Sequence, residues 1–409
     1  MRILFLSHYF PPEVNAPASR TFEHCRQWVR DGHQVTVVTC APNHPRGQIY
    51  RGYQNHGLFR EERDGISVIR LWTYITANEG FIKRTVNYVS FMVACIVTLP
   101  ALPTADVVIT TSPQFFNGLA GYFVSRAKRI PWVLEIRDLW PDSILAVGAI
   151  RNRCIIRLLE YLELFAYRKA DRIVPVTDAF KRHMEAKGIP SEKIIVIKNG
   201  VDLAFYTTPA GDNPLRAKLG LSGKFVAGYF GTHGMAHKLE VILDAAERLR
   251  TDPKVVFLLV GDGAERERLL KLRDDRRLTN VIMLDQLPKE DMPNLWDVCD
   301  VSLVLLRRSD LFKTVIPSKI FESMGMSRPI ILGVEGESTE IITVARAGFC
   351  IEPENVKQLA EKISLLANNP KLGRELGSNG RTYVTQYFDR TVLARRFLAL
   401  LQSLVSTNR

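Results

Sequence analysis

Several classes of protein are excluded by what this chain of 409 residues lacks. It has no run rich in Lys or Arg and no zinc or RNA-binding signature, so its net charge of +12 does not indicate nucleic-acid binding. Its six cysteines form no Cys-x-x-Cys pair, which favours reduced thiols over a disulfide framework. The first apolar run ends at His8 and Pro11, which is not the pattern of a signal peptide. We therefore expect a cytoplasmic protein.

The chain also lacks an apolar run long enough to span a bilayer with ease. Residues 86–102 are almost uncharged, but a spanning helix needs about 20 apolar residues and this segment is shorter and includes Asn87 and Ser90. Three alternatives stay open, namely a spanning helix, a buried core helix and a helix partly sunk in the bilayer surface. The basic residues Lys83 and Arg84 support the last of these.

The positive charge is concentrated in the first half of the chain. Residues 1–200 carry 26 Lys and Arg against 17 Asp and Glu, whereas the remainder carries 29 against 26. We expect this half to face an anionic partner, such as an anionic membrane surface or a substrate that carries a pyrophosphate.

What the sequence does contain is a regular alternation of short β-branched runs and amphipathic segments. The expected strands are 2–7, 34–40, 66–71, 106–111, 132–137, 172–177, 194–198, 225–230, 255–260, 281–284, 301–306, 329–333 and 349–352. The expected helices are 17–31, 115–128, 151–169, 179–187, 238–250, 264–276, 318–326, 355–368, 371–386 and 390–405. This alternation predicts an α/β protein with parallel sheets covered on both faces.

Two such series predict two Rossmann-like, doubly wound domains. The polar, Pro-rich stretch near 200–220 separates them, so we expect domains at 1–200 and 201–387, with a last helix at about 388–409 packing back on the first. Parallel sheets bind ligands at the carboxyl ends of their strands. The two carboxyl edges are expected to face each other across a deep inter-domain cleft.

The loop after the first strand is long and rich in proline. It has no Gly-x-Gly-x-x-Gly, and no acidic residue ends the second strand, which argues against a nicotinamide or flavin site. The loop is either an ordinary connection or a lining of the inter-domain cleft. For the second case, the candidate acceptor-binding residues are Pro12, Glu13, Asn15 and Arg20.

The strand 132–137 ends in a cluster of charged and aromatic residues. Asp138 is the candidate for a catalytic or hydroxyl-binding carboxylate, with Arg137 and Trp140 as further acceptor-binding residues. A structural Arg–Asp pair is the alternative.

Small-residue turns follow the strands of the second domain. Gly231, Thr232, His233 and Gly234 end its first strand, and Lys238 enters the next helix. Such a turn lets backbone N–H groups approach a phosphate closely. We add three residues that follow the next two strands to the nucleotide-binding set: Gly261, Gln286 and Leu287.

The segment Pro317-Ser318-Lys319 carries the strongest local signal. Pro317 stops the preceding segment and Ser318 is a predicted N-cap. Lys319 in the first turn is unfavourable for the helix dipole, unless an anion also lies there. Glu322, three residues on, lies on about the same helix face. A cation for a pyrophosphate and a carboxylate for ribose hydroxyls suit a sugar nucleotide; a generic amphipathic helix is the alternative.

These motifs together resemble the retaining GT-B glycosyltransferases of family 4, over essentially the whole chain. The resemblance rests on ILFLSHYFPPE (3–13), EIRDLWPDS (135–143), NGVD (199–202), GYFGTHG (228–234), LLVGDG (258–263), PSKIFESMG (317–325) and RPII (328–331). Within the family, the chain is similar to bacterial transferases of O-antigen and capsule assembly, particularly the N-acetyl-L-fucosamine transferase type.

The resemblance implies a glycosyltransferase whose second domain binds a UDP-sugar and whose first binds a lipid-pyrophosphate-linked saccharide. It implies that Glu322 binds the ribose, that Lys319 binds the donor phosphates with the Gly231–Gly234 turn, and that the anomeric configuration is retained without an enzyme nucleophile. The catalytic candidates are Asp138, Lys319 and Glu322, and the expected location is the inner face of the cytoplasmic membrane. The donor sugar expected from the resemblance is an N-acetyl-amino sugar such as N-acetylfucosamine.

The chain departs from the family pattern at three positions. Thr314 replaces the first Glu of a Glu-x7-Glu pair, and Thr232 and His237 stand where many members have Arg and Lys. No Asp-x-Asp motif and no His/Cys cluster with metal-ligand spacing occurs, so we expect no metal cofactor. The alternatives to a transferase are a sugar-nucleotide 2-epimerase of the same architecture and a non-catalytic sugar-nucleotide-binding partner; a dinucleotide-dependent oxidoreductase is disfavoured.

Overall fold

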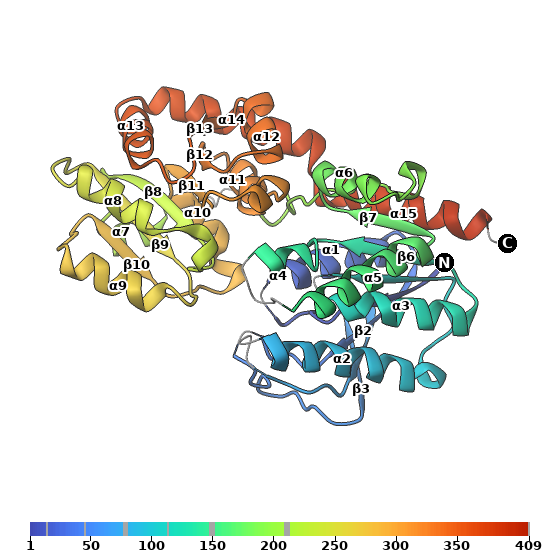
Figure 1. Cartoon of the computed structure of the whole chain (residues 1–409). Helices are drawn as coiled ribbons and strands as arrows, with labels where there is room; N and C mark the ends of the chain where they lie inside the picture. Colours follow the sequence, from blue (N-terminus) through green and yellow to red (C-terminus); the bar gives the residue numbers. More distant parts are fainter. Residues whose placement is uncertain are drawn as a thin grey trace. The chain divides into compact units, whose positions relative to one another are not determined.

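Each half of the chain folds as a predominantly parallel sheet flanked by helices (Figure 1). The computed structural model describes residues 1–13, 15–44, 46–76, 81–112, 114–146, 152–207 and 213–407. The chain divides into two compact units, Met1–Lys198 with Arg390–Arg409, and Asn199–Asp389. Part of the linker expected at 200–220, residues 208–212, lies outside the described residues.

The first unit holds a seven-stranded sheet in the order β3-β4-β2-β1-β5-β6-β7. Its strands are β1 (Arg2–Leu6), β2 (Gln34–Cys40), β3 (Leu58–Arg63), β4 (Ile66–Leu71), β5 (Val107–Thr111), β6 (Trp132–Ile136) and β7 (Arg172–Pro175). Its helices are α1 (Ala16–Arg30), α2 (Phe81–Val97), η1 (Leu99–Ala101), α3 (Phe115–Lys128), α4 (Asp142–Ala146), α5 (Arg153–Lys169), α6 (Asp178–Ala186), η2 (Ser191–Lys193) and α15 (Arg390–Thr407).

The second unit holds a six-stranded parallel sheet in the order β10-β9-β8-β11-β12-β13. Its strands are β8 (Phe225–Phe230), β9 (Val255–Val260), β10 (Val281–Leu284), β11 (Val301–Leu305), β12 (Ile330–Gly333) and β13 (Gly348–Cys350). Its helices are α7 (Pro214–Lys218), η3 (Met235–His237), α8 (Glu240–Arg248), α9 (Arg266–Asp275), η4 (Lys289–Asp291), α10 (Met292–Val298), η5 (Asp310–Thr314), α11 (Lys319–Gly325), α12 (Glu337–Ala345), α13 (Val356–Ala367) and α14 (Pro370–Tyr387).

The expected α/β architecture is confirmed, with three corrections. The first sheet is not wholly parallel, because β3 pairs antiparallel with β4 at its edge. The sequence pattern does not predict β3, because LFREER is charged and partly exposed, as edge strands often are. Residues 194–198 run beside β7, and the N–H groups of Ile195 and Ile197 donate to the carbonyls of Ile173 and Pro175. Only Ile194 is bridged to β7, however, so the strand expected there is wrong. The short helices α4, α7, α10 and α12 were also not expected.

The helix α15 completes the core of the first unit (Figure 1). Its apolar side chains Phe397 and Leu401 share a cluster with Phe5 and Trp28. The indole N–H of Trp28 donates to the carbonyl oxygen of Ala394 at 2.8 Å. The last helix of the chain is therefore as much a part of this core as the first.

A buried ion pair joins α1 to β6. The Nε of Arg20 donates to Oε1 of Glu135 at 2.8 Å, and its two Nη groups donate to the carbonyl oxygens of Lys198 and Ile197 at 2.8 and 2.9 Å. Burial alone would raise the pKa of Glu135, but the charges of Arg20 and Arg137 lower it below its usual value. The pair thus keeps a carboxylate ionised inside the first unit.

The apolar segment that begins near residue 86 belongs to α2, an amphipathic helix, and continues through η1. Its inner face buries Tyr88, Phe91 and Cys95, whereas Val93 and Val97 on the outer face are 47% and 71% exposed. The alternative of a buried core helix is therefore wrong. No described helix combines the length and apolar character needed to cross a membrane.

Arg20→Ala is predicted to destabilise the first unit by about 3–5 kcal/mol, because it leaves the carboxylate of Glu135 buried without its partner. Denaturant unfolding followed by far-UV circular dichroism measures the loss. The matched variant Arg30→Ala removes an exposed guanidinium at the end of the same helix and should change the free energy of unfolding by less than about 0.5 kcal/mol. Equal effects of the two variants would contradict a special role for the buried pair.

Candidate functional site

The carboxyl edge of the second sheet is built from two turns that bond to each other. The N–H of Gly231, after β8, donates to the carbonyl of Val260 at 2.8 Å, and the N–H of His233 donates to that of Asp262 at 2.9 Å. The carbonyl of His233 accepts from the N–H of Glu265 at 2.9 Å. The turns after β8 and β9 therefore form one small platform.

Glycine is required where these turns meet. Gly231 and Gly261 adopt φ of +134° and +152°, which side chains rarely allow. A Cβ on Gly261 would lie 1.9 Å from the carbonyl oxygen of Gly231. Gly234 has an ordinary φ of −110° and no such constraint. Two of the three predicted glycines are thus needed for a close backbone approach.

The amine of Lys319 lies over this platform. Its Nζ donates to Oη of Tyr229 at 3.1 Å and lies 4.4 Å from the centroid of the Tyr229 ring. A Cβ on Gly231 would approach Cε of Lys319 to 2.6 Å. The missing side chain of Gly231 therefore makes room for the ammonium group.

The charge of Lys319 is left without a close counter-ion. Burial lowers its pKa to about 8, against the opposing influence of Glu322. Among the described side chains, no carboxylate lies within 4.0 Å of its Nζ, and the hydrogen-bond partner it has is the neutral phenol of Tyr229. A partly buried ammonium of this kind favours an anionic ligand.

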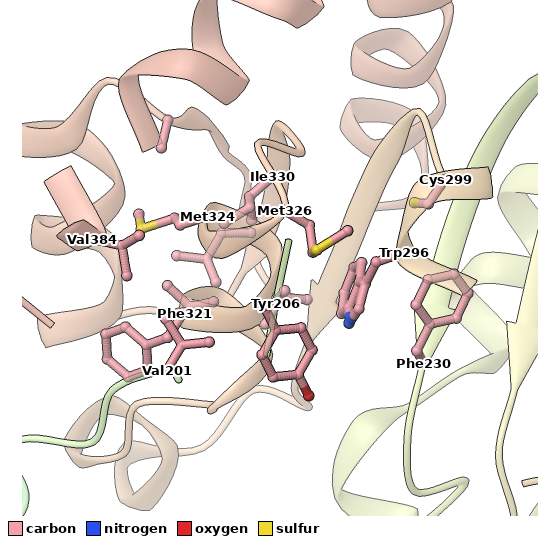
Figure 2. Packing of buried hydrophobic residues seen from close by; sticks show 14 of the residues in the cluster. Val201, Tyr206, Phe230, Trp296, Cys299, Phe321, Met324, Met326, Ile330 and Val384 are labelled. Atoms are coloured by element: carbon pink, nitrogen blue, oxygen red, sulfur yellow. The ribbon is translucent and has the colours of Figure 1, made fainter. Parts of the chain in front are cut away.

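Glu322 lies one turn further along α11, in a polar niche within the core. Burial raises its pKa, and the charges of Lys319 and Lys289 and the polar groups of Trp296 and Tyr206 act in the opposite direction. Figure 2 shows the hydroxyl of Tyr206 and the indole nitrogen of Trp296 on the same side of the surrounding apolar cluster. A carboxylate so placed can accept hydrogen bonds from ligand hydroxyl groups.

Two histidines complete the surroundings of the ammonium, and both are neutral. Burial lowers the pKa of His233 to about 4 and that of His237 to about 3. Both ring nitrogens of His233 are buried without a hydrogen-bond partner in the described part of the chain. They can therefore bond to a ligand, but neither histidine adds a positive charge to the site.

Most of the remaining nucleotide-binding candidates are more exposed than Lys319. Thr232 and Gln286 are exposed, and the exposed Lys238 has its Nζ 3.6 Å from Oε1 of Glu240. Leu287, beyond β10, packs against the apolar core of the second unit. These residues surround the platform without the tight contacts that hold Lys319.

The start of α11 differs from the expectation in one respect. Ser318 occupies the N-cap position after Pro317, but its side chain makes no capping hydrogen bond. Its φ and ψ of −60° and −26° are already helical, whereas a capping side chain needs an extended backbone. Thr314, in place of the first family Glu, bonds within η5 to the carbonyl of Leu311 at 2.7 Å.

Three acceptor-binding candidates of the first unit have structural partners instead. Arg20 is committed to Glu135 and two carbonyls, as described above. The Oε1 of Glu13 accepts from the N–H groups of Asn43 and His44 at 2.8 and 2.9 Å. Trp140 is buried, with its ring 4.9 Å from that of Phe115. These contacts explain the three residues without an acceptor.

The other two loop residues lie at the entry to α1. Asn15 caps this helix, accepting from the N–H of Ala18 at 2.9 Å, but its Nδ2 is buried without a hydrogen-bond partner among the described residues. Pro12 is half-buried in the turn before it. The amide of Asn15 therefore keeps one donor that a ligand can use.

Asp138 and Arg137 lie at the end of β6, and Arg137 keeps unused donors there. Burial raises the pKa of Asp138, whose Oδ2 accepts from Oγ of Ser143 at 3.0 Å. Burial lowers the pKa of Arg137 to about 10, and its Nε and Nη1 have no hydrogen-bond partner within the described ranges. The charge of Arg84, from α2, is close enough to lower the pKa of Asp138.

Sequence reasoning missed the aromatic part of the donor site. Tyr229, Tyr206 and Trp296 come from β8, the start of the second unit and α10, and they meet around Lys319 and Glu322 only in the fold. The one local signal was a tyrosine in an otherwise apolar buried strand, since a buried phenol usually finds a polar partner. In the described residues, no group of three His, Cys, Asp or Glu side chains could hold a metal ion.

Comparisons with known proteins agree with this architecture. A model described as a glycosyl transferase 4-like domain matches residues 15–200, and one for glycosyl transferases group 1 matches residues 212–383. The putative colanic acid biosynthesis glycosyl transferase WcaI of Escherichia coli K12 is 25% identical over 411 residues, which covers 97% of this chain and 99% of the relative.

Two further proteins are informative. The N,N'-diacetylbacillosaminyl-diphospho-undecaprenol alpha-1,3-N-acetylgalactosaminyltransferase of Campylobacter jejuni is 24% identical over 61% of this chain and 64% of its own. The solved structure of the Anabaena protein HepE in complex with UDP-glucose superposes with a TM-score of 0.72 at 20% identity, covering 98% of this chain and 100% of the other. The second likeness establishes the GT-B fold.

Gly231→Ala is predicted to weaken binding of UDP, the nucleotide expected from the sequence, by at least about tenfold. The new methyl group would displace the side chain of Lys319. The backbone of residue 231, with its positive φ, is also strained for alanine. Isothermal titration calorimetry measures the affinity. The control Gly373→Ala adds a methyl group where no atom lies within 4 Å, and should bind UDP as the unmodified protein does. Unchanged affinity in Gly231→Ala would contradict the packing of Lys319 on this turn.

UDP affinity is predicted to fall as the pH rises through about 8, approaching tenfold per pH unit, because the free protein then loses the proton that makes Lys319 cationic. The histidines stay neutral over this range and contribute nothing to the slope. Calorimetry between pH 7 and 9.5 tests this. Lys319→Arg, whose guanidinium stays charged, should give a flat profile. A steep profile in that variant would assign the titration to another group.

Proposed function

The chain is a glycosyltransferase of GT-B fold, and from this premise we propose that it transfers a sugar from UDP to a lipid-pyrophosphate-linked saccharide during assembly of a bacterial surface polysaccharide. The relatives support this proposal. One is described as a glycosyl transferase of colanic acid biosynthesis, and another as an N-acetylgalactosaminyltransferase acting on a diphospho-undecaprenol-linked sugar.

One observation carries the donor assignment, namely the ammonium of Lys319 held on Tyr229 with no carboxylate close enough to neutralise it. A diphosphate supplies the missing negative charge at this edge of the sheet. Glu322, one helical turn away, would accept hydrogen bonds from the ribose hydroxyls. HepE, a protein of the same fold, binds UDP-glucose, which supports UDP as the nucleotide.

The proposed reaction retains the anomeric configuration and uses no enzyme nucleophile. The acceptor oxygen forms a bond to the anomeric carbon as the bond to the β-phosphate oxygen breaks, and that phosphate takes the acceptor proton on the same face. The protein would then act by positioning the substrates and stabilising the charge on the leaving diphosphate, chiefly through Lys319. We propose an N-acetyl-amino sugar such as N-acetylfucosamine as the transferred group.

Asp138 is proposed to bind hydroxyl groups of the acceptor or the transferred sugar. Its pKa is raised by burial, and its carboxylate accepts from Oγ of Ser143 at 3.0 Å. The unpartnered Nε and Nη1 of the neighbouring Arg137 offer donors to the same ligand. Both residues follow β6 at the carboxyl edge of the first sheet, where ligands of parallel sheets bind.

The proposed location is the inner face of the cytoplasmic membrane, as a peripheral protein. The exposed apolar residues Val86, Val93 and Val97 lie along α2, and the exposed Lys83 lies in the first turn of the same helix. Apolar side chains next to cationic ones suit a surface of anionic lipids.

Lys319→Ala is predicted to lower UDP affinity about 10- to 100-fold and to lower kcat/KM by at least as much, because one charge-assisted contact to the diphosphate is lost. Glu322→Gln should weaken UDP more than free pyrophosphate, since it acts on the ribose. A thermal-shift panel of UDP, GDP, ADP and dTDP sugars, followed by calorimetry and a transfer assay, measures this.

Lys271→Ala, on α9 away from the site, is the matched control and should bind and transfer as before. Full affinity and transfer in Lys319→Ala would refute the donor assignment. Release of an epimerised sugar nucleotide without any acceptor would instead identify an epimerase.

Transfer is predicted to need no divalent metal, since Lys319 is proposed to bear the diphosphate charge. Activity measured in excess EDTA should match that in magnesium or manganese. Loss of activity in EDTA that manganese restores would show that a metal ion shares this task.

A further inference from the structure

A cavity of about 370 Å³ opens at the amino edge of the second sheet. Its lining comes from the residues that enter β8, β9, β11 and β12, together with the end of α13 and the start of α14. The glycine turns of the candidate site follow β8 and β9 at the opposite edge of the same sheet. The cavity is therefore separate from the site proposed for UDP, and its volume is within the range of small-molecule pockets, roughly 300–1,000 Å³.

Positively charged side chains predominate in the lining of this cavity. Asp300 contributes a carboxylate, and the cations are Lys224, Lys254, Arg328 and Arg374. The Oδ2 of Asp300 already accepts from the N–H of Val226 at 2.8 Å and from Nη2 of Arg216 at 3.0 Å. Four cations against one carboxylate leave an excess of three positive charges, which favours an anionic ligand.

Most of these cations have no ionic partner in the protein. In the part of the chain that the structure describes, Lys224, Lys254 and Arg374 make no ion pair with a carboxylate. Arg328 has its Nη2 2.9 Å from Oδ1 of Asp297, but its Nε is buried without a hydrogen-bond partner among the described residues. The cavity thus holds donors for an anion that the protein itself does not supply.

The start of α14 adds to the attraction for an anion. The first five residues of this long helix include Lys371 and Arg374 and no acidic residue. Cations at the amino end of a helix are unfavourable for its dipole, unless an anion also lies there. Pro370 and Gly373, from the same turn, line the cavity. The helix dipole and the cations therefore favour the same kind of ligand.

Part of the lining is apolar. The half-buried Phe225 and the side chains of Pro329, Leu366 and Ala367 contribute to it. A Cβ on Gly373 would meet no atom within 4 Å, so the wall is open at this position. Apolar and cationic groups in one cavity suit an organic anion better than an inorganic one.

We propose that this cavity is a second ligand site, which binds a phosphate ester with an apolar or ring-shaped body. Lys254, Arg374 and the free Nε of Arg328 hold the phosphate, and the apolar part of the lining holds the body. A phosphate monoester carries a charge of about −1.5 to −2 near neutral pH, which suits the excess of cations. The ester is either a free phosphorylated metabolite or the headgroup of an anionic phospholipid, and it binds together with UDP rather than in its place.

Calorimetry with naphthyl phosphate tests this site, and inorganic phosphate and naphthol are the probes that lack one half of the ligand. With UDP present at saturation, naphthyl phosphate should bind at least about tenfold more tightly than either partial probe, because both halves contribute. Equal affinity for inorganic phosphate would contradict the apolar part of the site. Displacement of naphthyl phosphate by UDP would assign its binding to the other edge of the sheet and overturn the proposal.

Arg374→Glu and Lys254→Glu reverse exposed charges at the cavity, and each should weaken naphthyl phosphate at least about tenfold. Lys271→Glu reverses an exposed charge on α9, outside the cavity, and is the matched control that should keep full affinity. Equal losses in all three variants would show that the net charge of the unit attracts the ester, against the proposal.

Gly373→Phe fills the cavity without changing its charge and should abolish the binding of naphthyl phosphate. Ser378→Phe, at an exposed position of the same helix outside the cavity, is its control and should bind as before. Full affinity in Gly373→Phe would contradict the proposal.

Vesicles of phosphatidylcholine with and without phosphatidylglycerol distinguish the two sources of the ester. Binding of free naphthyl phosphate that Arg374→Glu weakens identifies a soluble metabolite as the ligand. Binding only to phosphatidylglycerol vesicles, lost in Arg374→Glu and kept in Lys271→Glu, identifies a lipid headgroup. Binding to neither would overturn the proposal. None of these measurements uses sugar transfer, so they succeed or fail independently of the proposed reaction.

Discussion

The candidate site of the second unit depends on a charge that the fold leaves unbalanced. The ammonium of Lys319 lies against the ring and hydroxyl of Tyr229, above a turn whose Gly231 has no side chain to exclude it. Its neighbours His233 and His237 are neutral, and burial already lowers its own pKa to about 8. The site is therefore more stable with an anion than without one, and the glycines of the adjoining turns are what let a phosphate come close.

The sequence located the charged part of this site because that part is local. A turn after a strand and a cation beside a carboxylate on one helical face can be recognised from neighbours in the chain, and Gly231, Lys319 and Glu322 do meet as expected. Tyr206 and Trp296 were missed because their closeness to Glu322 arises only when distant segments pack together. The N-cap bond of Ser318 was wrongly expected, since residue type alone does not reveal that its backbone is already helical.

In the first unit, the local sequence predicts some elements and misses others. The expected strands 34–40 and 66–71 match β2 and β4 in full, because both segments are rich in Val and Ile, whereas the charged β3 has no such pattern. Arg20 and Trp140 have partners within the first unit, and their role in acceptor binding stays a prediction. The partner of Arg20, Glu135, is 115 positions away, and nothing near Arg20 in the chain reveals that its charge is already matched.

The position of α15 at the end of the sequence affects the order in which the two units fold during synthesis. The core of the first unit includes Phe397 and Leu401, which leave the ribosome after all of the second unit. The second unit can thus complete its own core before α15 packs on Trp28 and its neighbours in the first unit. The part of the protein made first is the last to become fully folded, so its apolar surfaces stay open to chaperones or to a nearby bilayer until translation ends.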